Sequence, residues 1–212
     1  MKIVPPTREG LREAAECIRS GGVVAYPTET VYGLAVDPFS VTALQKLLHI
    51  KGRASGNPFL LIVSGPEQLA DVTASLSRNA RAFAEAFWPG PLSLLFPIAP
   101  ALPAALTADS PKVSLRCPGC ETARALCTAV GHAVTSTSAN RSGEPSGRKP
   151  ADIALTGIDV CIDGGELAKN PPSTVYDPGL GRVLRAGAVS VAALSEVARE
   201  AGLEPPDIGA LE

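Results

Sequence analysis

The chain has 212 residues, of which 45% are hydrophobic and 19% are charged, and its formal net charge at pH 7 is -2. A chain of this length can bury a sizeable apolar core, and no linker-like stretch forces a split into two domains. The slightly acidic balance argues against a protein whose whole surface binds nucleic acid, so any basic site must be a local patch.

We expect neither a signal peptide nor a membrane segment. The first residues combine Lys2 and Arg8 with two prolines and contain no apolar run of the kind a signal peptide needs. Residues 89–108 carry no charge, but the five prolines among them would break a membrane-spanning helix. The sequence therefore predicts a soluble cytoplasmic protein.

The five cysteines are an odd number in a chain without an expected export signal, so we expect no disulfide framework. Cys117 and Cys120 form a C-x-x-C turn, a spacing that can hold a metal ion or act as a redox pair. A zinc site needs two more ligands, and Cys127 and His132 do not form a second paired motif. We expect no metal site, and the role of Cys117 and Cys120 stays open.

The first predicted elements are a helix and a short buried strand. Thr7 is placed to cap the helix, and the glycines at 21–22 end it. The apolar, β-branched run at 23–26 predicts a strand, which Pro27 ends because proline has no backbone N–H. Residues 28–30 (Thr-Glu-Thr) then follow a strand end, where open α/β sheets place ligand crevices, although a simple turn is the alternative.

A second helix is predicted from its cap, Ser40, to Gly52, with Lys51 and Arg53 at its exit. The later predicted elements are a strand at 59–63, a short helix from Pro66, a helix capped by Ser77, strands at 92–96 and 112–116, a helix at 121–130, strands at 133–137, 160–162, 172–176 and 183–185, and a helix at about 191–201. We expect a single domain over 1–202, followed by a Pro-rich, acidic and flexible tail at 203–212.

Hydroxyl, amide and guanidinium side chains recur at the predicted strand ends and turns. They are Thr28, Thr30, Arg53, Arg116, Ser138, Asn140, Ser173, Thr174 and Arg185. Guanidinium groups bind carboxylate and phosphate through two hydrogen bonds, and Ser, Thr and Asn orient neutral groups, so this set suits an anionic ligand. Each residue alone is better explained as a surface arginine or a turn residue, and only their joint placement favours a site.

Several common enzyme signatures are missing from the sequence. There is neither a G-x-x-x-x-G-K-[ST] loop nor a G-x-G-x-x-G after a strand, so a P-loop ATPase and a Rossmann dehydrogenase are not supported. The chain has two histidines, and Ser138 lies outside any G-x-S-x-G elbow, so a Ser/His/Asp hydrolase is a poor hypothesis.

From about residue 7 to 200 the chain resembles the YrdC/TsaC family of threonylcarbamoyl-AMP synthases, in the short form without an extra C-terminal domain. The resemblance rests on an ordered set of motifs: Pro27-Thr28-Glu29-Thr30-Val31-Tyr32-Gly33-Leu34, Lys51-Gly52-Arg53, Asn57-Pro58, Ser114-Leu115-Arg116, Ser138-Ala139-Asn140, Pro172-Ser173-Thr174-Val175 and Leu184-Arg185-Ala186-Gly187. The K-x-R motif together with the S-x-N motif is the most specific part.

The resemblance implies a fold, a reaction and partners. The fold is an α/β (α+β) one, a twisted and mostly mixed sheet flanked by helices and curled around a basic cleft. The reaction joins L-threonine, bicarbonate or carbon dioxide, and ATP into threonylcarbamoyl-AMP, and it releases pyrophosphate. The product supplies the machinery that makes threonylcarbamoyl-adenosine in tRNA. Mg²⁺ is expected to arrive with the nucleotide, and weak RNA binding is an open expectation.

The resemblance also implies roles for individual residues. Threonine would be held by Thr30, Arg116, Ser138 and Ser173, with Arg116 as the partner of its carboxylate. ATP would be held by Arg53, Asn57, Asn140 and Arg185, and Lys51 and Arg53 would act in catalysis by stabilising charge on the phosphates. Positioning and electrostatics can carry such a transfer, so no protein nucleophile is needed.

Three positions depart from the family pattern. Ile62 stands where many members have a histidine in the threonine pocket. Lys112 stands where the nucleotide often meets a threonine, and Arg148 where a Thr or Ser often follows the S-x-N loop. Both basic residues are expected to contact ATP through phosphate.

Three alternatives remain beside the synthase. An RNA-binding module of the same fold is disfavoured by the acidic balance and by the lack of interleaved basic and aromatic residues. A YciO-like relative without synthase activity is disfavoured because Lys51, Arg53, Ser138 and Asn140 are intact. A carbamoyl-transfer domain of the hydrogenase-maturation type is expected to come with acylphosphatase and zinc-finger segments that this sequence does not contain.

Overall fold

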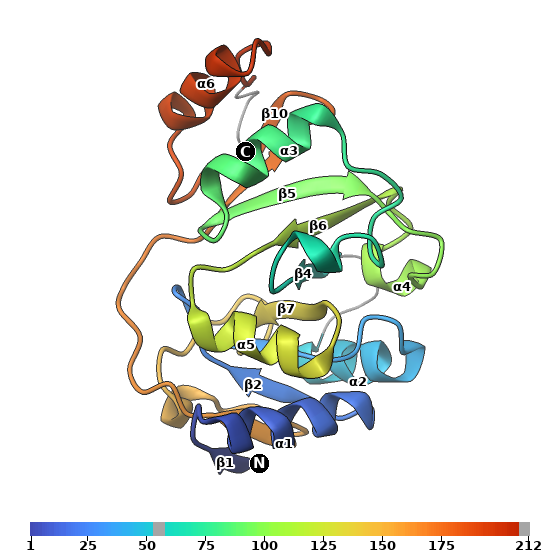
Figure 1. Ribbon diagram of the computed structural model, residues 1–212. Helices are drawn as coiled ribbons and strands as arrows, with labels where there is room; N and C mark the ends of the chain where they lie inside the picture. Colours follow the sequence, from blue (N-terminus) through green and yellow to red (C-terminus); the bar gives the residue numbers. More distant parts are fainter. Residues whose placement is uncertain (53–57, 208–212) are drawn as a thin grey trace.

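A computed structural model describes residues 1–52 and 58–207. These residues form one sheet in the order β1-β8-β2-β3-β7-β4-β6-β5-β9-β10, stacked from the lower to the upper end of the molecule in Figure 1. The sheet contains parallel pairs such as β4 with β6 and antiparallel pairs such as β5 with β6, which confirms the predicted mixed sheet. The strands are β1 (Lys2–Val4), β2 (Val24–Tyr26), β3 (Gly33–Ala35), β4 (Leu60–Ile62), β5 (Leu92–Pro97), β6 (Lys112–Arg116), β7 (Val134–Ser138), β8 (Val160–Ile162), β9 (Thr174–Asp177) and β10 (Arg182–Arg185).

Four of the long helices begin where a side-chain oxygen satisfies a free amide of the first turn, whereas α5 begins without a side-chain cap. Thr7 caps the first helix by accepting from Gly10 N, and Ser40 and Ser77 do the same for the next two long helices, as predicted. The helices are α1 (Arg8–Arg19), α2 (Val41–Lys51), α3 (Arg78–Phe87), α4 (Ala104–Thr107), α5 (Glu121–Val130) and α6 (Val191–Glu200), with 3-10 turns at η1 (Pro66–Gln68) and η2 (Pro150–Asp152).

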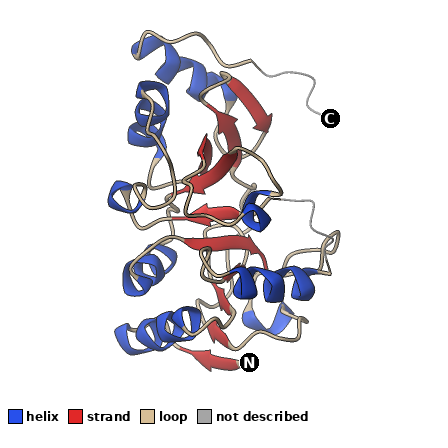
Figure 2. Cartoon of the chain, turned by 90° about the vertical axis from the view of Figure 1, so that its right-hand side faces the viewer, coloured by secondary structure: helices blue, strands red, loops and turns tan. Residues whose placement is uncertain are grey.

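Two apolar clusters lie on the two faces of the sheet. Tyr26 and Ile62 pack in one cluster with residues of α1 and α5. Leu61 and Leu94, which face the other way, pack in the second cluster with residues of α2, α3 and α6. The sheet twists from end to end, so α3 lies on the same side of the molecule as α1 and α5 in Figure 2, with α2 on the other side.

Four short elements were not predicted, one of which is the 3-10 turn η2. β1 and β3 have three residues each and depend on their neighbours, because β1 pairs with β8 and β3 pairs with both β2 and β7. α4 is a single turn inside the uncharged stretch at 89–108. None of the helices in the described part of the chain is long and apolar enough to cross a membrane.

Residues 163–173, here called the strap, connect β8 near one end of the sheet to β9 near the other. In Figure 1 the strap is the long orange coil along the left edge of the molecule. Its beginning is tied to the chain after β2, because Tyr32 Oη accepts from Gly164 N and donates to Gly165 O, both at 2.9 Å. Further along, Asn170 Nδ2 donates to the carbonyl of Glu29 at 2.7 Å.

The described part of the predicted tail follows α6 back to the sheet. Asp207 N donates to Gly181 O at 2.7 Å, and Val183 N donates to Asp207 O at 2.9 Å, so this segment lies beside β10. The domain boundary at 202 and the flexible tail over 203–212 stay predictions.

Candidate functional site

A cavity of about 620 Å³ lies where strands from both halves of the sheet meet the strap. Side chains from the turn before β3 and from β4, β5, β6, β7, β9 and β10 line it. It brings together six residues that the sequence placed in the site: Thr30, Lys112, Arg116, Ser138, Ser173 and Arg185. Residues more than 150 positions apart in the sequence therefore meet in one hollow.

The turn after β2 is organised by the hydroxyl of Thr28. This oxygen accepts from Thr30 N at 3.1 Å and from Val31 N at 3.2 Å, and it donates to Val31 O at 2.7 Å. It also lies 3.0 Å from the hydroxyl of Thr30. Thr28, which the sequence grouped with the site residues but gave no role of its own, thus fixes the position of Thr30 at the cavity wall.

Arg116 ends β6 and is 5% exposed, so its guanidinium is held inside the protein. Glu29 Oε2 lies 2.5 Å from Arg116 Nη2 and forms an ion pair with it. The contact lacks the geometry of a hydrogen bond, and Arg116 Nε is buried without a hydrogen-bond partner among the described residues. Arg116 therefore lines the cavity with a guanidinium in which one buried donor, Nε, lacks a partner among the described residues.

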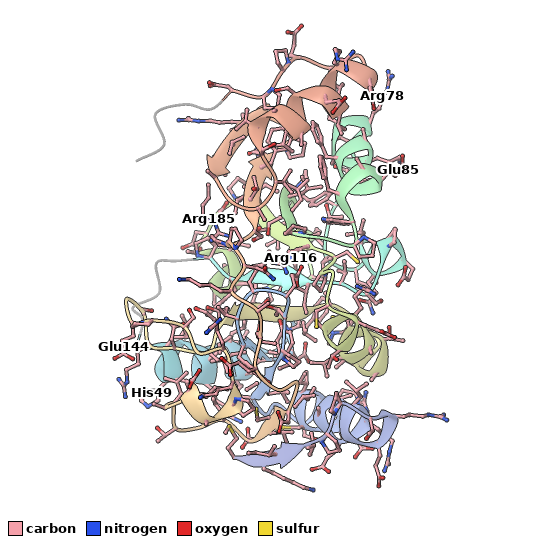
Figure 3. All side chains as sticks on the ribbon, turned by 90° about the vertical axis from the view of Figure 1, so that its left-hand side faces the viewer. His49, Arg78, Glu85, Arg116, Glu144 and Arg185 are labelled. Atoms are coloured by element: carbon pink, nitrogen blue, oxygen red, sulfur yellow. The ribbon has the colours of Figure 1, made fainter. Side chains whose placement is uncertain are left out.

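Arg185 and Ser173 form a second polar group on the same wall. Arg185 donates from Nε and Nη2 to Ser173 O at 3.1 and 2.8 Å, and from Nη2 to Ser173 Oγ at 2.9 Å. Burial lowers the pKa of Arg185, and the nearby charge of Arg116 lowers it further. Figure 3 shows the two arginines close together at the middle height of the molecule.

Lys112 reaches the cavity from β6 as one member of an ion pair. Its Nζ lies 2.5 Å from Asp177 Oδ2, and the other carboxylate oxygen accepts from Gly179 N and Leu180 N. Asp177 is buried, so its charge is compensated by this cation and by two amides. The sequence analysis did not include Asp177.

Lys51 is buried at the end of α2, with 2% of its surface exposed. Its Nζ donates to the carbonyls of Ser138 and Asn140 at 2.5 and 2.6 Å and to Asn140 Oδ1 at 3.2 Å. Gly52 follows in the left-handed conformation, with φ 61°, and ends the helix. The K-x-R and S-x-N motifs are thus joined by direct hydrogen bonds from Lys51.

The other five predicted residues do not line the cavity or are not described, and Lys51 and Asn140 are two of them. Arg148 donates to Leu167 O at 3.3 Å and pairs with Glu166 at 3.5 Å, so it contacts the strap and does not line the cavity. Arg53 and Asn57 lie outside the described residues.

The sequence analysis missed several cavity residues. Ser93 is 1% exposed, and its Oγ lies 3.0 Å from Ser173 Oγ. It stands in an apolar strand, where nothing in the sequence marks it, and Asn170 and Ser146 stand in loops. Ser114 could have been found, because alternation along β6 places it on the same face as Lys112 and Arg116.

Ile62, which departs from the family pattern, is buried against α5 and does not line the cavity. Leu60 from the same strand does line it. An apolar side chain therefore forms this part of the wall.

The cysteines are all free thiols. Cys117 Sγ donates to Ser64 O and Cys120 Sγ to Pro27 O, so the C-x-x-C side chains point to two different segments. Burial raises the pKa of Cys117 to about 11, which disfavours its thiolate. Among residues 1–52 and 58–207, no three His, Cys, Asp or Glu side chains are grouped to hold a metal ion.

The chain is similar to proteins of one family over most of its length. A model of the Sua5/YciO/YrdC domain, described as telomere recombination, matches residues 16–187. The threonylcarbamoyl-AMP synthase of Thiobacillus denitrificans is 37% identical over 183 residues, which cover 85% of this chain and 97% of the relative. The synthase of Pyrococcus abyssi is 33% identical over 221 residues, which cover 99% of this chain and 64% of the relative.

Solved structures give the same grouping. The P. abyssi Sua5 structure complexed with L-threonine matches with a TM-score of 0.86 and 32% identity, covering 92% of this chain and 59% of that chain. E. coli YciO matches with a TM-score of 0.77 over 91% of this chain, and its 24% identity supports the fold alone. Since the family model and these relatives match most of the sequence, the chain belongs to the Sua5/YciO/YrdC family.

Proposed function

We propose that this chain is a threonylcarbamoyl-AMP synthase, which makes threonylcarbamoyl-AMP and pyrophosphate from L-threonine, bicarbonate or carbon dioxide, and ATP. The observation that carries this assignment is one cavity lined by all four residues expected to hold threonine and by two of those expected to hold ATP, Lys112 and Arg185. Relatives of this name match most of the chain at 33–37% identity.

In this assignment the wall around Arg116 holds threonine. The Arg116 guanidinium lines the cavity and suits a carboxylate, and Thr30 and Ser173 line the same cavity, where their hydroxyls would orient the amino acid. Ser138, at the end of β7, is the fourth residue of this group. Burial strengthens each of these contacts, because the local dielectric is lower than that of water.

In the same assignment, ATP interacts with the other cationic side chains of the site. Arg185 lines the cavity without a carboxylate partner among the described residues, so its charge is available for phosphate. Lys112 joins it from β6. Lys51 holds Asn140 in place, and Lys51 and Arg53 stabilise charge on the phosphates, as the family resemblance implies.

The reaction follows from holding these groups together. The threonine nitrogen bonds to the carbon of carbon dioxide and loses a proton, which gives a carbamate. A carbamate oxygen then bonds to the α-phosphorus while the bond from that phosphorus to the pyrophosphate oxygen breaks. Because both partners are bound in one cavity, orientation and charge stabilisation lower the barrier without a protein nucleophile.

Mg²⁺ would be held by the oxygens of the triphosphate, which are ligands it prefers, and would supply positive charge near the pyrophosphate. The described cavity wall offers hydroxyls and cations and no grouped set of carboxylates, which fits a metal ion carried by the nucleotide. The product would pass in the cytoplasm to the machinery that modifies tRNA.

The test is threonine-dependent release of pyrophosphate from ATP in the absence of RNA, with bicarbonate and Mg²⁺ present. We expect release with L-threonine and only background release without it. Calorimetric titration with L-threonine and with ATP separates binding from turnover. An RNA-binding module or an inactive relative would release no pyrophosphate above background, and that result would refute the assignment.

A further inference from the structure

Glu29 joins three segments that meet at the cavity. Its Oε2 pairs with Arg116 Nη2 at 2.5 Å, at the end of β6. Its Oε1 accepts from Gly119 N at 2.9 Å, in the loop that follows β6, and its carbonyl accepts from Asn170 of the strap. The residue therefore connects the turn after β2 to the arginine, to the loop behind that arginine and to the strap.

Both members of this ion pair are incompletely satisfied. Arg116 Nε and Glu29 Oε2 are buried and have no hydrogen-bond partner among the described residues. A buried donor without a partner is costly, so a native structure that keeps one invites an explanation. Because Arg116 lines the cavity, a small shift of its guanidinium toward a bound carboxylate would satisfy this donor, while Nη2 stays with Glu29.

The chemistry at Glu29 requires a carboxylate. Its two oxygens face two donors, the amide of Gly119 and the guanidinium of Arg116. An amide in the same place could accept from one of them only by turning its own NH₂ group toward the other. Glu29 also offsets the charge of Arg116, which otherwise lies beside Arg185 with no carboxylate between them among the described ion pairs.

We propose that Glu29 is a positioning residue for threonine: it fixes the Arg116 guanidinium through Nη2 and leaves the other N–H groups of the fork for the carboxylate of the amino acid. This inference rests on the proposed synthase function. Glu29 itself does not line the cavity, so its effect on the substrate passes through Arg116.

The test is the kinetics and threonine binding of Glu29→Gln. We expect the KM for threonine to rise about tenfold, the size of one lost charge-assisted hydrogen bond, with the KM for ATP within about twofold of wild type. Glu29→Asp keeps the charge on a shorter side chain, and its KM for threonine should lie between those of wild type and Glu29→Gln. Glu13→Gln, which loses an exposed ion pair with Lys2 at the far end of the sheet, is the matched control and should leave both constants unchanged.

A double-mutant cycle separates positioning from a general structural effect. In an Arg116→Lys background, Glu29→Gln should change threonine affinity less than about twofold, because the group that it positions is gone. An unchanged threonine KM in Glu29→Gln, equal losses for threonine and ATP, or full additivity in the cycle would each overturn the inference. If wild type binds threonine by calorimetry but releases no pyrophosphate, the synthase assignment fails, and the binding cycle still decides the role of Glu29.

Discussion

Arg116 carries a specific expectation at the scale of single residues. Arg116→Lys keeps the charge but removes the planar fork and the free Nε donor. We expect the KM for threonine to rise about 10- to 100-fold, while the KM for ATP changes little. Initial-rate pyrophosphate assays over both substrates measure the two constants. Equal increases in both would contradict a threonine-specific role.

The buried thiols give a dependence on alkaline pH. Burial raises the pKa values of Cys17, Cys117 and Cys161 from 9.0 to about 11. A folded pKa above the unfolded value stabilises the protein fully below pH 9, and this contribution is lost as the pH rises toward 11. We expect the Tm to fall between pH 9 and 10.5.

The control for this effect is Cys117→Ala, which removes one of the titrating groups. Its Tm at pH 8 will be lower because a buried side chain is truncated. Its further decrease between pH 9 and 10.5 should nevertheless be smaller than in wild type. A Tm that is flat over this range in wild type would show that the thiols do not contribute.

At the scale of elements, two substitutions at the ends of α2 should lower stability to a similar extent but differ in their effect on activity. Ser40→Ala removes the cap at the start of the helix, and Gly52→Ala forces a side chain into the left-handed conformation at its end. Each should lower the free energy of unfolding by about 1 kcal/mol. Only Gly52→Ala disturbs the end that carries Lys51 and its hydrogen bonds to Ser138 and Asn140.

We therefore expect Gly52→Ala to lower kcat and Ser40→Ala to leave it unchanged. Denaturant unfolding measures the stability of both variants, and pyrophosphate release measures their activity. If the two variants lose activity in parallel, stability alone accounts for the effect, and the coupling of the helix end to the site is wrong.

The elements that could be predicted from sequence are those fixed by local chemistry. The caps at Thr7, Ser40 and Ser77 are confirmed, because each depends on one hydroxyl and an amide three residues later. β1 and β3 were missed, since three residues make a strand only when a partner is present. Register and partner choice depend on tertiary contacts that no local pattern contains.

The candidate site likewise contains features that could be predicted from the sequence and features that could not. Arginines and hydroxyls at strand ends could be located from the sequence, and Arg116, Ser173 and Arg185 do share one cavity. The burial of Lys51 beneath the S-x-N loop and the pairing of Lys112 with Asp177 could not, because each joins residues more than 60 positions apart. Their roles toward threonine and ATP remain proposals.

At the scale of the whole molecule, the cavity is lined by distant strands and by the strap, so bound substrates should hold these parts together. Ligands that bind only the folded state raise stability by about 2.7 kcal/mol at 100 times their Kd, which for a chain of this size is about 5–10 °C in Tm. We expect L-threonine with α,β-methylene ATP to give an increase of this size in thermal scans.

The control is Arg116→Ala, in which the part of the increase due to threonine should be lost while the part due to the nucleotide remains. D-Threonine, which presents the same groups with the wrong handedness, should add less than the L form. A Tm that does not respond to either substrate in wild type would contradict binding in this cavity.

The beginning of the strap sets a limit for anyone who wishes to change which amino acid this protein uses. A Cβ added at Gly164 would lie 2.6 Å from the ring of Pro27, the residue that follows β2, and the Tyr32 hydroxyl holds the two glycines at 164 and 165. This end of the strap therefore does not accommodate larger side chains. At the other end, Asn170 and Pro172 line the cavity, so a library aimed at substrate range belongs at those positions, at the cost of the hydrogen bond from Asn170 to the carbonyl of Glu29.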